Sequence, residues 1–142
     1  MKVFYEAAAA LVPFRTHLFQ HDPPEKPTAA DFPYVVLWGD LGWEFSGDQP
    51  GWDASLADLP DHLELNIQAT YTGISKESVD VVLRGTRKAL NRAVLTVPGY
   101  HCNRLKQRPV MGIDSDKSVQ LSHGHPYYAV DEYHLIASKE KS

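Results

Sequence analysis

The chain has 142 residues, of which 43% are hydrophobic and 23% are charged, and its formal net charge is −4. This length and composition are typical of one globular domain that buries about two-thirds of its unfolded surface. The negative net charge argues against a dedicated nucleic-acid-binding domain, which is usually basic. Cys102 is the only cysteine, so the chain can form no internal disulfide and fits a reducing compartment such as a bacterial cytoplasm.

No segment of the sequence has the length and apolarity that are needed to cross a membrane. The N-terminal AAAALV is not expected to be a signal peptide, because Glu6 precedes it and Pro13 ends it. Alanine and leucine favour helix and proline stops it, so we predict a first helix over residues 3–12. A proline-rich connector follows at residues 21–31.

The run PYVVLW at residues 33–38 is apolar, β-branched and aromatic, which predicts a strand. Residues 39–60 are rich in glycine and proline and are predicted to be a long irregular loop, which is commonly functional in a compact domain. This loop carries Trp43, Phe45 and Trp52, which are large apolar groups typical of interface anchors. The simpler alternative is that these rings cover part of their own sheet.

Residues 62–71 (HLELNIQATY) alternate between apolar and polar side chains, which predicts a strand with one buried face. After Thr72 and Gly73 the apolar period changes to about 3.6 residues, which predicts an amphipathic helix over residues 75–94. Ser75 is its expected N-cap, and Glu77 lies favourably in its first turn. The apolar stripe of this helix consists of Val79, Val82, Leu83, Thr86 and Leu90.

Further strands are predicted at residues 100–107 and 126–137, with a short strand-like piece at residues 119–121. The order of elements predicts a single α+β domain over residues 1–142. We expect a mainly antiparallel or mixed sheet of about four strands, with both helices packed on one face.

Histidine and cysteine residues offer the main candidates for chemistry. His123 and His125 form an H-x-H pair in a loop, and His134 could join them as a metal ligand from the last strand. Since no carboxylate–histidine motif or second cysteine accompanies them, we favour uncoordinated surface histidines. His101 and Cys102 are adjacent in a predicted strand and point to opposite faces, so Cys102 is expected to be an inert thiol. The sequence therefore predicts no catalytic residue, metal or cofactor.

Charge is segregated along the chain. The stretch from Asp31 to Glu64 contains carboxylates and no lysine or arginine, whereas residues 81–113 contain no acidic residue. The basic positions on the polar face of the second helix are Arg84, Arg87, Lys88 and Arg92. They could be a solvated face, or a nucleic-acid patch, although no aromatic side chains are interleaved. A third alternative is a contact with the acidic loop of a neighbouring subunit, which would be head-to-tail and could close into a ring.

Four segments in this order resemble the tail terminator (tail-completion) proteins of long-tailed bacteriophages. They are FPYVVLW, SLADLPDHLELNIQATYTGIS, VVLRGTRKALNRAVLTVPG and PYYAVDEYHLIA, and together they span about residues 33–137. The tryptophan-containing loop matches no motif of that family.

The resemblance implies a non-enzymatic α+β subunit that forms a ring, typically a hexamer, at the head-proximal end of the tail tube. Such a ring terminates tube polymerisation and offers a surface to head–neck connector proteins, while DNA passes through without specific binding. It implies a virion protein that is assembled in the host cytoplasm. The alternatives are another head–tail connector or neck adaptor protein and, more remotely, a small metal-dependent enzyme that uses His123, His125 and His134.

Overall fold

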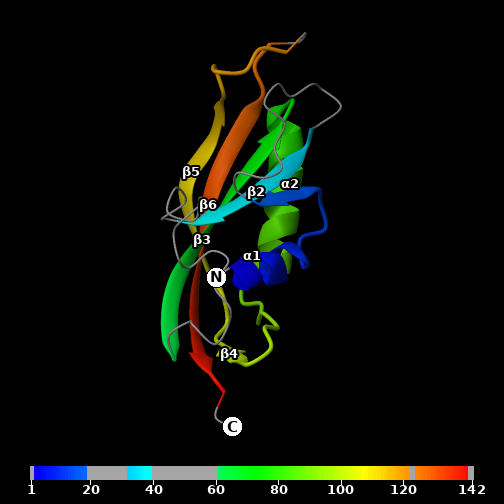
Figure 1. Ribbon diagram of the computed structural model, residues 1–142. Helices are drawn as coiled ribbons and strands as arrows, with labels where there is room; N and C mark the ends of the chain where they lie inside the picture. The colour runs from blue at the N-terminus through cyan, green and yellow to red at the C-terminus, as the bar shows by residue number, and fades with distance from the viewer. Residues whose placement is uncertain (1, 19–31, 40–60, 122–123, 141–142) are drawn as a thin grey trace, which may run out of the picture.

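The computed structural model describes residues 2–18, 32–39, 61–121 and 124–140 (Figure 1). Within these residues the chain folds into two helices and a six-stranded curled sheet. The elements in chain order are α1 (Lys2–Ala9), β1 (Thr16–Leu18), β2 (Tyr34–Gly39), β3 (His62–Gly73), α2 (Lys76–Leu90), β4 (Tyr100–Cys102), β5 (Lys106–Ser115) and β6 (Tyr127–Lys139). The predicted α+β class is confirmed, although the sheet has more than the expected four strands.

The sheet is mixed and is organised around β6. Its strand order is β1-β2-β3-β6-β4, and β5 also pairs with β6. All pairs are antiparallel except β1 with β2, which is parallel. The extra strands are short or divided, because β1 has three residues and the predicted strand at residues 100–107 is split into β4 and the start of β5. Strand β5 then continues to Ser115, beyond the predicted end.

The strand β3 shows directly how sequence alternation produces a buried face. Its odd-numbered residues from Leu63 to Gly73 are buried, whereas most even-numbered residues are exposed or half-buried. In register with β6, Ile67 lies opposite Tyr133 and Ala69 opposite Asp131, so the buried faces of the two strands are continuous. Strand β6 is the predicted last strand, and it is buried at alternate positions in the same way.

The helix α2 begins and packs as the sequence predicts. The Ser75 hydroxyl accepts a hydrogen bond from the Ser78 backbone N–H at 3.1 Å, and the Ser78 hydroxyl accepts one from the Ser75 N–H, which completes a capping box. Val79, Val82, Thr86 and Leu90 are buried, and Leu83 packs against the core. The helix ends at Leu90, four residues before the predicted end, because residues 92–93 bond to the β4–β5 connection instead of continuing the helix.

Both helices contribute to one core. Phe4, Tyr5 and Ala8 of α1 lie in the same buried cluster as Val82 of α2 and Ile67 of β3. Figure 1 shows α2 lying along the sheet with α1 beside it. The helix α1 ends at Ala9, earlier than the predicted residue 12, because a turn begins at Ala10.

A close approach explains why a glycine occupies the middle of α2. A Cβ atom at Gly85 would lie 2.6 Å from two ring atoms of Phe14. Glycine within a helix is about 1 kcal/mol less favourable than alanine, so its presence here reflects the packing of the Phe14 ring directly on the helix backbone. This contact ties the segment that follows α1 to α2.

Candidate interaction surface

The basic stretch of residues 81–113 divides into two groups in the structure. Arg84, Arg87 and Arg108 form salt bridges with Asp80, Asp131 and Glu132, respectively, at 2.7–2.9 Å. The second group has no carboxylate partner among the described residues and consists of Lys88, Arg92, Arg104 and Lys106. The positive charge that is available to a partner therefore lies at the C-terminal end of α2 and the start of β5.

Arg87 was predicted on the polar face of α2, but its guanidinium turns toward the sheet. It donates two hydrogen bonds of 2.7 Å to Asp131, which is 1% exposed. The hydroxyl of Tyr71 donates to Asp131 at 2.8 Å and lies 2.8 Å from the Tyr133 hydroxyl. A buried charge is stable only when it is paired and hydrogen-bonded, so Arg87 completes a polar cluster in the core of its own chain.

This buried cluster changes the acid–base properties of its members. The hydrogen bonds that Arg87 donates to Asp131 raise the pKa of Arg87, which keeps the guanidinium charged. Burial, reinforced by Tyr133 and Asp131, raises the pKa of the Tyr71 hydroxyl far above its ordinary value. Burial also raises the pKa of Tyr133. The two tyrosines therefore stay neutral and serve as hydrogen-bonding groups in the core.

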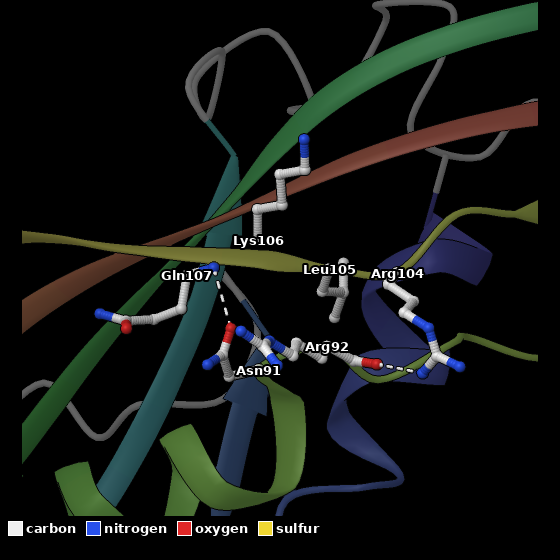
Figure 2. Close-up of a pocket in the computed structure, with 6 residues that line it drawn as sticks. All are labelled: Asn91, Arg92, Arg104, Leu105, Lys106 and Gln107. Atoms are coloured by element: carbon white, nitrogen blue, oxygen red, sulfur yellow. Dashed lines mark hydrogen bonds between the residues drawn. The ribbon is translucent and has the colours of Figure 1, made fainter.

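Three of the unpaired cations, Arg92, Arg104 and Lys106, contribute to the lining of a depression with a volume of about 720 Å³ where α2 ends (Figure 2). The residues that line it are Asn91, Arg92, Arg104, Leu105, Lys106 and Gln107. Its rim carries no acidic side chain. The nearby valine Val94 is 49% exposed, so an apolar group accompanies the charges.

The backbone of the depression is held in an uncommon conformation. Arg92 has φ of 66°, a left-handed value that non-glycine residues rarely adopt. Its N–H donates to the Leu105 carbonyl oxygen at 2.8 Å, and its carbonyl oxygen accepts a hydrogen bond of 3.0 Å from Arg104 Nη1. The Asn91 side-chain oxygen accepts from the Gln107 N–H at 3.4 Å. These contacts fix the end of α2 against the β4–β5 connection.

Figure 2 shows that the cations do not converge on one point. The Arg104 and Arg92 side chains extend in opposite directions along the β4–β5 connection. Lys106 projects from the opposite side of the strand to Leu105. One buried donor in the depression is unused, because the Gln107 side-chain nitrogen Nε2 has no hydrogen-bond partner among the described residues. The arrangement suits an extended acidic chain rather than one small anion.

The sheet face that points away from the helices carries a second polar arrangement. The Trp38 indole N–H donates to Thr70 Oγ1 at 3.0 Å, and Gln68 Nε2 donates to Glu132 at 3.0 Å. His134 contacts Asn66 through Nδ1 at 2.6 Å and Glu64 through Nε2 at 2.8 Å. These side chains are therefore already paired across β2, β3 and β6.

The structure does not bring His134 to the H-x-H loop. Both of its ring nitrogens have partners on the sheet, and it lies seven residues along β6 from Tyr127, or roughly 23 Å. His125 Nδ1 lies 2.5 Å from the carbonyl oxygen of Val119, and His123 lies outside the described residues. No group of three metal-ligating side chains occurs in the described part of the chain.

His101 and Cys102 lie on opposite faces of β4, as predicted, with Cys102 buried and His101 exposed. Burial raises the pKa of the Cys102 thiol, which keeps it in the unreactive protonated form. Among the residues that the structure covers, no helix is long and apolar enough to span a membrane. Trp43, Phe45 and Trp52 lie outside the described residues, so the prediction that they anchor an interface stays a prediction.

Sequence reasoning missed two features of this surface. The alternation of apolar residues along β6 places Asp131 at a buried position of the strand. Because a buried carboxylate requires a cationic partner, this position was the signal that a lysine or arginine must reach it. Arg104 and Lys106 also belong to the stretch without acidic residues, but sequence spacing does not place them with Arg92, because they meet only when the chain returns to the end of α2 before β5. No protein-family model matches the chain, and comparison with curated proteins finds no match.

Proposed function

We propose that this protein is a structural component of a long-tailed bacteriophage that forms a ring of head-to-tail subunits at the head-proximal end of the tail tube. The ring would terminate tube polymerisation, contact the tail tube protein on one side and head–neck connector proteins on the other, and let DNA pass without specific binding. The proposal concerns a virion protein without catalytic activity.

The observation that carries this proposal is the separation of charge. The unpaired cations Arg92, Arg104 and Lys106 contribute to one depression, and the same chain carries a long run of carboxylates between Asp31 and Glu64. Two segments of opposite charge in one chain support a head-to-tail contact between copies, which generates a ring when the rotation closes. A chain with one self-complementary patch would instead favour a two-fold dimer.

The segments that resemble tail terminators also support the proposal, because they belong to one contiguous unit. They contain β3 and most of β2, α2 and β6. Strand β2 pairs with β3, β3 pairs with β6, and α2 packs against β3 and β6. The support would be weaker if the segments that resemble tail terminators lay in parts of the fold that do not contact one another.

The test uses electron microscopy of purified protein, alone and mixed with polymerising tail tubes. We expect rings with a central hole and tubes whose head-proximal ends are capped. Tubes that grow to the same lengths with and without the protein would refute termination. Rings that bind isolated heads but leave tube growth unchanged would identify a head–tail connector or neck adaptor instead.

A further inference from the structure

We infer that the depression at the end of α2 is the receptor for the acidic segment of a second copy of this chain, residues 40–61. The inference rests on the proposed ring and specifies which residues make its subunit contact. The receiving side chains are Arg92, Arg104 and Lys106. The exposed part of α2 that carries Arg84 is not the principal contact.

The pairing pattern singles out this depression within the basic stretch. Arg84, Arg87 and Arg108 already have carboxylate partners in their own subunit. The three cations of the depression have no such partner in the described part of the chain, so each can accept a carboxylate without breaking an existing ion pair. Arginine suits this task because its planar guanidinium binds carboxylates through two parallel hydrogen bonds.

The divergence of the cations selects an extended occupant. Figure 2 shows Arg92 and Arg104 reaching in different directions and Lys106 on the other side of the strand. A single phosphate or carboxylate can contact only one of these cations at a time, whereas a chain with spaced carboxylates can contact them in turn. The segment carries such spaced carboxylates at Asp40, Glu44, Asp48, Asp53 and Asp58, whereas Asp61 at its end already pairs with Lys139.

The composition of the segment favours a protein occupant over DNA. Aromatic residues accompany its carboxylates, and Val94 is an exposed apolar side chain two residues beyond Arg92. A protein interface combines an apolar centre with a polar rim, so this mixture fits such a contact. The chain as a whole is negatively charged, which disfavours the phosphate backbone of DNA as the partner.

Arg92→Gly is the most informative variant for this inference. It removes one cation from the depression and places glycine at a position whose φ is 66°, where glycine fits without steric penalty. The thermal midpoint of the subunit should therefore be unchanged or higher. We expect its self-association, measured by sedimentation equilibrium of the full chain, to weaken by up to about five-fold, which is the effect of one exposed ion pair.

Two further variants, Arg104→Gln and Lys106→Gln, test the other cations, and all three changes together should weaken self-association at least about three-fold. Lys117→Gln is the matched control, because Lys117 is exposed in a turn away from the depression, and it should associate as the wild type does.

Salt dependence gives an independent test. Raising the salt from 50 to 300 mM should weaken the self-association of the wild type more than that of the triple variant, since salt screens exposed pairs over about 8–10 Å at intermediate ionic strength.

A labelled synthetic peptide of residues 40–61 provides a direct probe in fluorescence polarisation. We expect it to bind the wild-type protein more tightly than the triple variant, and a peptide with its Asp and Glu changed to Asn and Gln should lose this preference. If a labelled DNA duplex bound the wild-type protein more tightly than the peptide does, and if the triple variant lost this binding, the inference would be overturned in favour of nucleic acid. A monomer at every concentration, with salt-dependent melting, would show that the contact lies within one subunit and would also overturn it.

The outcomes separate this inference from the proposed function. Rings that form and cap tubes normally in the triple variant would refute the role of the depression and leave the ring proposal intact. A wild-type protein that neither self-associates nor caps tubes would refute both. Rings lost in the triple variant and retained in Lys117→Gln would support both.

Discussion

Replacing Arg87 by methionine removes the cation that faces buried Asp131 and keeps an unbranched side chain that can occupy the same path. Asp131 is 1% exposed, and among the described residues it then retains the Tyr71 hydroxyl as its hydrogen-bond partner. Removing one partner of a buried ion pair costs about 3–5 kcal/mol. The Arg87 side chain is 35% exposed, so water can reach the remaining carboxylate and we expect the lower end, about 3 kcal/mol.

Urea denaturation followed by tryptophan fluorescence measures this loss. A domain of this size has a free energy of unfolding of about 5–15 kcal/mol, so the variant should stay folded but lose a large share of its stability. With a slope of about 2 kcal/mol per molar urea, the midpoint should fall by about 1.5 M. Arg84→Met is the matched control, because the Arg84–Asp80 pair is exposed and should contribute no more than about 0.5 kcal/mol.

A double variant tests whether the uncompensated charge is the cause. Combining Arg87→Met with Asp131→Asn removes the buried charge together with its partner, so the double variant should be less destabilised than the sum of the two single changes. Additive losses, or an Arg87→Met loss no larger than that of Arg84→Met, would refute the conclusion that this pair stabilises the core.

Three further predictions concern the core and α2. Burial raises the pKa of Tyr71, whereas an unfolded tyrosine ionises near pH 10, so above that pH the unfolded state loses its proton first and the free energy of unfolding should fall as the pH rises. In urea titrations Tyr71→Phe should make this fall shallower by up to about 1.4 kcal/mol per pH unit, and an unchanged slope would count against the prediction. Gly85→Ala should destabilise the protein by about 1–3 kcal/mol despite its better helix propensity, because its Cβ would meet the Phe14 ring, and the loss should shrink in a Phe14→Ala background if this clash is its cause. Ser75→Ala should lower the unfolding free energy by about 1 kcal/mol through loss of the N-cap, whereas Ser75→Gly should lose only a few tenths; equal effects would exclude a capping role.

Periodicity in the sequence determined the long elements of this protein. The alternation from His62 to Tyr71 requires a strand with one apolar face, and the stripe from Val79 to Leu90 requires a helix that packs on it. These patterns are local, because a period of two or of 3.6 residues is set by the backbone geometry of the element itself. Ser75 could be predicted as the N-cap for the same reason, since its partner Ser78 is three residues away.

Only the tertiary structure decided the short strands, the end of α2 and the composition of the basic surface. Strand β1 forms because it pairs with β2, and α2 stops where Arg92 and Ala93 bond to Leu105. Arg84 and Arg87 are both polar residues on one helix, yet one pairs with exposed Asp80 and the other with buried Asp131 on β6. Sequence spacing specifies the direction of a side chain around a helix, but its partner depends on which distant strand the fold brings to that face.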